Sequence, residues 1–258
     1  MHKAQGTRLE RQRFHASVRA VALLGLCACF GLVHADAADE RPDFTGVWTT
    51  YSEPGQARPV RGAAAPQLPL TDVAKKKVAA YRALVGPAGD TPGGYCLGTG
   101  MPGSMLGSGG YPMEIHQRPE QLVIVYEAHN EIRRVYLGSR IVPDADRIPG
   151  RNGHSSAHWE GDTLVVETTH LVEQVDQQYA HSDQARIVER YRLTQGADGG
   201  KVLVAEMTMT DPVFYTEPIK ADKKWAFVPN GHLLPYECAE EGWHKRLEEL
   251  EKKARAGV

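Results

Sequence analysis

Hydrophobic and polar positions follow a strand-like spacing from Met113 to residue 238. The apolar runs in this stretch are MEIHQ, QLVIVYEA, EIRRVYLGSRIV, SAHWEG, DTLVVETTHLV, ARIVERYRLT, KVLVAEMTMTD and KKWAFV. They are rich in β-branched and aromatic residues, and turn-forming residues separate them. This spacing predicts successive strands joined by tight turns, and therefore an antiparallel meander of about eight strands.

The edges of such a meander determine the expected fold. Free edge strands invite pairing with other chains, so a long meander must close on itself or be covered. We therefore expect a mainly β fold in which the strands close into a lipocalin-like barrel or half-barrel, with a helix as plug or lid. A two-sheet sandwich is the alternative. Within the meander, WEGDTLVV predicts a hairpin whose turn uses the positive φ that Gly161 allows.

The segments before and after the meander predict one short strand and two helices. Residues 42–50 (PDFTGVWTT) favour a strand. Residues 70–84 favour a helix that Thr71 or Asp72 can cap. Residues 239–255 are charged almost throughout and predict a solvated helix at the end of the chain.

A glycine-rich segment, CLGTGMPGSMLGSGGYP (96–112), lies between the first helix and the meander. Its GTGMPG stretch (98–103) has the G-x-G-x-x-G spacing of a dinucleotide-binding loop. Such a loop must follow a strand, open a helix and meet an acidic residue about 20 positions later. Here no strand precedes it, and Pro102 removes an amide that could bind phosphate. We interpret the segment as a pliable lid or plug at the barrel mouth, with Met101 and Met105 as apolar contacts.

The first residues have the features of a secretory signal peptide. A basic stretch precedes AVALLGLCACFGLV (20–33), and small residues follow, with cleavage expected after Ala35 or Ala37. The apolar run is shorter than the roughly 20 residues of a membrane-spanning helix. We expect an exported protein, periplasmic or secreted, with no membrane anchor beyond the cleaved signal. An uncleaved anchor, or a lipoprotein modified at Cys29, is the alternative.

The expected organisation is a signal peptide followed by one domain. The segments are residues 1–37 (signal peptide), 38–112 (strand, helix and glycine-rich loop), 113–238 (barrel) and 239–258 (charged C-terminal helix).

Charge and cysteine content narrow the classes of partner and site. The chain has 30 Lys and Arg against 32 Asp and Glu, without a basic stripe, so we expect no nucleic-acid partner. Cys96 and Cys238 remain after removal of the signal. In an oxidising compartment we expect them to form a disulfide. Two free thiols, acting as nucleophile or ligand, are the alternative.

Polar residues on the strands supply the first candidates for chemistry. Glu189 falls on the apolar face of its strand. Its carboxylate either pairs with a cation such as Arg133 or Arg134, or has its pKa raised by burial and acts in a functional site. Glu114 and His116 share one face of the MEIHQ strand, which makes Glu114 a second candidate acid.

Two histidines are candidates because they lie beside Gly or Ser at expected strand ends. His154 and His181 could exchange protons, with Glu114 or Glu189 orienting one of the rings. Alternatively, these rings could belong to a metal site, or could simply form hydrogen bonds to loop backbone. On a straight strand, His154 and His158 would lie about 13 Å apart, too far to share one metal ion. We expect no metal and no cofactor.

The remaining candidates would contact a ligand. We assign substrate binding to Arg133, Arg134, Tyr136, His116, Trp159 and Met101. His129 is expected on the surface. No G-x-S-x-G sequence is present, so we do not expect a serine nucleophile.

Several segments, taken in order, resemble a family of exported bacterial proteins of unknown activity. They are PDFTGVW, CLGTGMP, YPMEI, GHSSAHWEGDTLVVETT, HSDQARIVERYRL, DPVFYTEP and LLPYECAE, and they span nearly all of the mature chain. The resemblance implies a periplasmic location and a mostly β, lipocalin-like fold, and it implies no particular activity. His158 departs from the family pattern, which more often has another basic residue there. The matching residues are Trp48, Glu114, His154, Ser155, Trp159, Asp162, His181, Ser182, Glu189, Arg190 and Cys238.

These observations lead to competing hypotheses of function. The first is an enzyme of isomerase, lyase or hydratase type that performs cofactor-free acid–base chemistry on a fairly apolar small molecule. His154 and His181 would carry protons, with Glu114 or Glu189 as partner acid. The alternative is a lipocalin-like carrier that binds a hydrophobic ligand without turnover. A structural partner in an envelope complex is a third hypothesis, and the oligomeric state stays open. Convergence of two of the four residues on one cavity would favour the enzyme.

Overall fold

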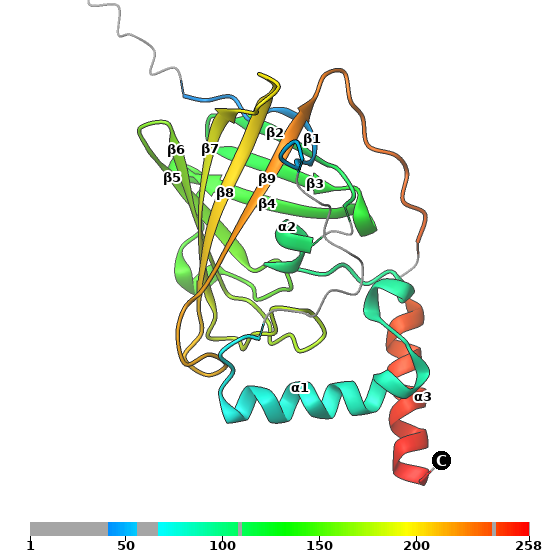
Figure 1. The fold of residues 1–258 in the computed structure, drawn as a ribbon. Coiled ribbons are helices and arrows are strands. Elements are labelled where there is room, and N and C mark those ends of the chain that lie inside the picture. The colour runs from blue at the N-terminus through cyan, green and yellow to red at the C-terminus, as the bar shows by residue number, and fades with distance from the viewer. Residues whose placement is uncertain (1–40, 56–66, 108–109, 239–240, 258) are drawn as a thin grey trace, which may run out of the picture. The chain divides into compact units, whose positions relative to one another are not determined.

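The computed structural model describes residues 41–55, 67–107, 110–238 and 241–257, all within one compact unit, Arg41–Val258. In this part of the chain, nine strands form a closed barrel in sequential order (Figure 1). The expected lipocalin-like, mainly β fold is therefore confirmed. The expected signal peptide lies outside the described residues. The strands are β1 (Gly46–Thr50), β2 (Met113–Arg118), β3 (Gln121–Tyr126), β4 (Glu131–Leu137), β5 (His154–Glu160), β6 (Thr163–Thr169), β7 (Arg186–Gln195), β8 (Lys201–Thr210) and β9 (Ile219–Val228).

Closure of the barrel depends on one parallel pair of strands. A ring with an odd number of strands cannot have every neighbour antiparallel. β4 and β5 run parallel, with Val135 opposite Ser155, and every other neighbouring pair, including β1 with β9, is antiparallel. Parallel strands need a long crossover, which residues 138–153 provide. The expected all-antiparallel meander is wrong at this junction.

β1 completes the wall from a distant part of the sequence. Trp48 of β1 pairs with Met113 of β2 on one side and with Phe227 of β9 on the other. The Trp48 side chain is fully buried, and its Nε1 donates to the Phe44 carbonyl at 2.9 Å. The barrel therefore includes a strand from the segment that the sequence places before residues 113–238.

Strand alternation determines which side chains face the interior. On β5, the buried residues Ser155 and Ala157 alternate with His154 and His158, which face outward. The hairpin between β5 and β6 turns at Gly161, whose φ is 56°, as its sequence predicts. The apolar core includes Ile115, Leu122, Ile124, Leu164, Ile187 and Leu203.

An ion pair crosses the barrel interior. The side chains of Arg133 (β4) and Glu189 (β7) are 1% and 0% exposed. Arg133 Nη1 donates to Glu189 Oε1 at 2.9 Å, and Nη2 donates to Oε2. Arg133 also donates to Ser155 Oγ at 3.1 Å and to Thr168 Oγ1 at 2.8 Å. The Tyr191 hydroxyl donates to Glu189 Oε1 at 2.7 Å. Of the two roles that the sequence allows for Glu189, the structure shows the ion pair with Arg133.

Three helices accompany the barrel: α1 (Asp72–Val85), α2 (Gly103–Gly107) and α3 (Glu241–Ala256). Thr71 caps α1, since its Oγ1 accepts from the Ala74 amide at 3.2 Å. The sequence predicts α3 as a solvated appendage, yet Trp243 and Leu250 are buried and pack with Val85. The predicted helix is present and most of its described residues are exposed, but it is not a free appendage, because these two apolar residues pack on α1. Among the described residues, no helix is long and apolar enough to cross a membrane.

The predicted disulfide is confirmed. Cys96 and Cys238 are bonded, with their Cα atoms 5.3 Å apart. The bridge joins the glycine-rich segment to the strand-free stretch that leads to α3. It therefore links two segments separated by 142 positions in the sequence.

Replacing Arg133 with methionine tests the interior ion pair. The change would leave the Glu189 carboxylate buried without its counter-charge. We expect the free energy of unfolding to fall by about 3–5 kcal/mol, because removing one partner of a buried pair strands the other charge. Urea unfolding at neutral pH, followed by fluorescence, measures the loss.

Arg190→Met is the matched control on the outer face of β7. Arg190 pairs with Glu160 at 2.7 Å, and both side chains are largely exposed. Exposed pairs contribute about 0–1 kcal/mol. Similar losses in the two variants would contradict a special role for the interior pair.

Candidate functional site

Residues 98–107, hereafter the plug, occupy one end of the barrel. Met101 and Met105 are buried in the same apolar core as the strands. α2, which forms the second half of the plug, contacts β9 (Figure 1). The glycine-rich segment, interpreted from the sequence as a lid or plug, is therefore packed into the barrel with part of it helical.

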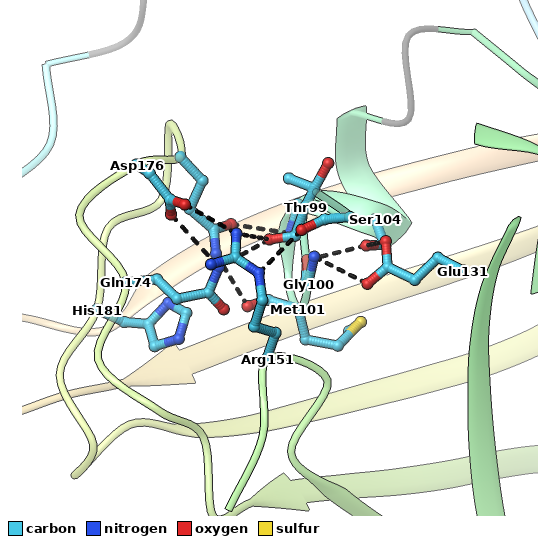
Figure 2. A network of polar contacts seen from close by, with 12 residues as sticks. Thr99, Gly100, Met101, Ser104, Glu131, Arg151, Gln174, Asp176 and His181 are labelled. Carbon is cyan, nitrogen blue, oxygen red and sulfur yellow. Dashed lines mark hydrogen bonds and ion pairs between the residues drawn. The ribbon is translucent and has the colours of Figure 1, made fainter. Parts of the chain in front are cut away.

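Glu131 of β4 anchors the plug through its carboxylate. Its Oε1 accepts from the Gly100 amide at 2.9 Å, and its Oε2 accepts from Ser104 Oγ at 2.6 Å. Figure 2 shows the carboxylate turned toward both plug residues. One acidic side chain from the barrel wall thus satisfies two donors on the plug.

Arg151, from the crossover between β4 and β5, holds the other side of the plug. Its Nε donates to the Gly98 carbonyl at 2.9 Å, and its Nη2 donates to the Thr99 carbonyl at 3.3 Å. Asp176 pairs with the same guanidinium at 2.9 Å (Figure 2). The backbone of Arg151 adds a further bond, because its carbonyl accepts from the Met101 amide at 3.0 Å.

Two glutamines from the β6–β7 connection complete the contacts. Gln174 Nε2 donates to the Thr99 carbonyl at 2.8 Å. Gln177 Nε2 donates to the Met101 carbonyl at 3.2 Å, and its Oε1 accepts from the Gly103 amide at 3.0 Å. The plug is therefore held by polar side chains from three separate segments of the barrel.

The glycines of the plug allow this close approach. A Cβ atom at Gly100, whose φ is 72°, would lie 2.6 Å from the Arg151 carbonyl and 2.7 Å from Gln174 Oε1. One at Gly103 would lie 2.7 Å from Gln177 Oε1. The amides of both glycines are already bonded to side chains. The G-x-G-x-x-G spacing thus serves packing and leaves neither amide free for a phosphate.

His181 adjoins this network through Gln174, and one of its ring nitrogens has no hydrogen-bond partner among the described residues. It pairs with Gln174 through two backbone bonds of 2.9 and 2.8 Å. Its Nδ1 lies 3.2 Å from the Tyr179 carbonyl, so Nδ1 carries the proton. Within the described structure, Nε2 of this ring and Oε1 of Gln174 are buried without a hydrogen-bond partner. Burial lowers the pKa of His181, which favours the neutral ring with a bare acceptor at Nε2.

A cleft of about 500 Å³ opens beside the plug, within the size range of small-molecule sites. Its walls are formed by plug residues, by the β6–β7 connection and by residues near the start of β9. Apolar and amide side chains dominate, and Asp222 is the charged residue among the described lining. The lining includes Leu106, Tyr111, His129, Gln177, Tyr179 and Ala221.

Aromatic side chains form one corner of the cleft. The ring centroid of Tyr236 lies 5.1 Å from that of His129 and 5.8 Å from that of Tyr111. His129 has a φ of 62°, and its Nδ1 is buried without a hydrogen-bond partner in the described structure. His129 is therefore half-buried in the wall of an open cleft, where the sequence predicts a surface position. The sequence shows a turn at His129-Asn130, but it does not show where the His129 ring points, which depends on its contact with Tyr236, a residue distant in the sequence.

The four candidate catalytic residues do not share one site. Glu114 faces outward on β2 and lies 3.6 Å from His116, also on the outer face. His154 faces outward on β5, whereas Glu189 lies in the interior and His181 beneath the plug. Among the described residues, no contact joins any two of the four. The convergence that would favour the acid–base enzyme is not found.

His154 has its own surroundings on the outer face. Its ring stacks on Tyr136, with centroids 5.2 Å apart and planes 18° apart. Burial lowers its pKa, and the nearby Arg147 and His170 lower it further. The neutral ring is therefore favoured, at a distance from the plug.

The candidate binding residues are also dispersed. Arg133 is in the interior ion pair, whereas Arg134 is exposed on the outer face of β4. Trp159 packs on Phe44, with ring centroids 5.5 Å apart. Met101 alone belongs to the plug, where its carbonyl accepts from the cleft residue Gln177. Of these candidates, only Met101 is tied to the cleft.

Neither a metal-ligand cluster nor a similar known protein identifies a function for this site. Within the described part of the chain, no three His, Cys, Asp or Glu residues are grouped to hold a metal ion. Comparison of the chain with protein-family models finds no match, and comparison with curated proteins finds none either.

Replacing Gly100 with alanine tests the fit of the plug. We expect the free energy of unfolding to fall by at least about 2 kcal/mol, because the new Cβ strains a left-handed residue and meets the Arg151 carbonyl. Gly86→Ala is the control, since Gly86 is right-handed helical and a Cβ there meets nothing within 4 Å. Urea midpoints compare the two variants, and an unchanged midpoint for Gly100→Ala would contradict the tight plug.

Proposed function

We propose that the protein is an exported, lipocalin-like barrel that binds a small, partly apolar molecule in the cleft beside the plug, without converting it. The observation that carries this proposal is the cleft itself. Its volume is within the range of small-molecule sites, as are the volumes of other described clefts, and it is distinguished from them by walls that include the plug together with three other segments of the chain.

The chemistry of the cleft walls supports an apolar ligand with a few polar groups. Leu106 and Ala221 supply aliphatic surface, and Tyr111 and Tyr179 supply aromatic surface. The side-chain amide of Gln178 can orient a polar group of the ligand. Such a mixture, apolar with a few placed polar groups, is typical of ligand pockets.

The location of the candidate acids and bases favours binding over catalysis. A general acid or base must reach its substrate directly or through one water molecule. Glu189 is engaged by Arg133 inside the barrel, and His154 and Glu114 face outward on the wall. None of these three lies in the cleft lining.

Two features support export. The sequence begins with the pattern of a secretory signal peptide. The Cys96–Cys238 bridge is of the kind that persists in oxidising compartments such as the periplasm.

One observation keeps an isomerase, lyase or hydratase as a second candidate. His181 presents a neutral ring with a free Nε2, which is the form of a general base. The ring is fully buried, so a substrate would reach Nε2 only if the plug moved.

Binding of N-phenylnaphthylamine, a neutral dye that fluoresces in apolar surroundings, tests the proposal. We expect saturable binding to the native protein. Ala221→Phe fills the cleft from β9, so we expect its affinity to fall at least about tenfold. Fluorescence titration measures both.

Ala226→Phe is the matched control, because Ala226 lies on the opposite face of β9 from Ala221. We expect it to bind the dye as the native protein does. Absence of saturable binding to the native protein, or equal affinity of the Ala221→Phe variant, would contradict the proposed site.

A further inference from the structure

We infer that the ligand carries a single carboxylate on an apolar body, and that Lys223 of β9 binds this carboxylate. The inference rests on the proposed function and specifies the chemical class of the ligand.

Lys223 lies on the inner face of the barrel. Alternation along β9 places Ala221, Lys223 and Trp225 on the same face, and Trp225 is buried in the core. Lys220 and Lys224 lie on the opposite face and are exposed. β9 therefore directs one lysine inward, where a lysine is costly unless it has a partner.

The ammonium group of Lys223 is poorly satisfied. Its hydrogen bond among the described residues is to the Leu106 carbonyl at 3.4 Å, long compared with the usual 2.9–3.0 Å. A lysine has three donors, so at least two lack a described protein partner. By contrast, Lys224 pairs with Glu53 at 2.8 Å, whereas no described carboxylate lies within ion-pair distance of Lys223. Burial lowers the pKa of Lys223, consistent with a cation that lacks its counter-charge.

Lys223 is not itself among the described lining residues, but its ammonium group contacts one of them. Leu106, whose carbonyl it contacts, lines the cleft, and so does Ala221. Ala221 is two positions from Lys223 on the same strand face, which is about 7 Å. Asp222 also lines the cleft, although strand parity places it on the opposite face of β9 from Lys223, so the acid group is expected on the Leu106 side, away from Asp222. A ligand in the cleft can therefore extend an acid group past Leu106 to Lys223.

A single lysine indicates a singly charged acid. Phosphate groups are commonly bound by arginine forks or by several backbone amides. No arginine appears in the described lining of the cleft, and the amides of Gly100 and Gly103 are already bonded. One point charge beside a partly apolar cleft matches one carboxylate on a partly apolar body.

The experiment compares dansylaminoundecanoic acid with its methyl ester, which has the same body without the charge. We expect the native protein to bind the acid at least about tenfold more tightly than the ester, as expected for a hydrogen bond between charged groups. Lys223→Met should lower the affinity for the acid to that for the ester, and leave the ester's affinity unchanged. Fluorescence titration of the dansyl group gives all four values.

Lys220→Met, on the outer face of the same strand, is the matched control and should keep the preference for the acid. We expect Lys223→Met to unfold at a urea concentration no lower than the native protein, because it removes an unpaired cation. Equal binding of acid and ester by the native protein, or an unchanged preference in Lys223→Met, would overturn the inference while leaving the binding site in place. Failure of the native protein to bind even the ester would instead overturn the proposed function.

Discussion

The parallel pairing of β4 with β5 is the constraint on which the rest of the structure depends. It allows nine strands to close with β1 antiparallel to β9. It also requires the crossover 138–153, and this crossover supplies Arg151, which holds the plug. The topology that closes the wall thus also provides the group that closes one end of the barrel.

Polar side chains in the barrel interior and near the plug differ in how many hydrogen-bond partners they have. In the interior, Arg133 and Glu189 pair with each other, and Ser155, Thr168 and Tyr191 add further hydrogen bonds to the pair. At the plug, His181 Nε2 and Gln174 Oε1 stay without a described partner, and Lys223 has one long bond. Buried polar atoms without a described partner are not confined to the cleft: they include His129 Nδ1 in its wall, Tyr126 Oη inside the barrel and His154 Nε2 on β5.

Local patterns in the sequence predict the features that depend on neighbouring residues. Strand parity places Glu189 inward, Gly161 marks a hairpin turn, and Thr71 caps α1. The features that depend on distant contacts are not predicted. In the sequence, the connection between β4 and β5 looks like an ordinary loop between antiparallel strands. The burial of Trp243 depends on packing against α1, which is distant in the sequence.

The candidate site shows the same division. His154 begins β5, as predicted, whereas His181 lies in the connection between β6 and β7, outside the strands. The position of a residue along the sequence does not reveal which side of the barrel wall its loop occupies. Lys223 carries a usable signal, because the alternation of β9 directs it inward. The sequence alone does not show that Lys223 points inward, because the charged residues on either side of it obscure the alternation of apolar and polar positions. Its direction becomes clear only when the pairing of β9 with its neighbours is known.

The most direct test of the account is NMR of protein labelled with ¹³C at the methionine methyl groups, titrated with dansylaminoundecanoic acid. Met101 and Met105 belong to the plug, beside the cleft. We expect the methyl signals of these two residues to move in a saturable manner as the acid binds. Bound acid that leaves both signals unchanged would contradict a ligand site at the plug.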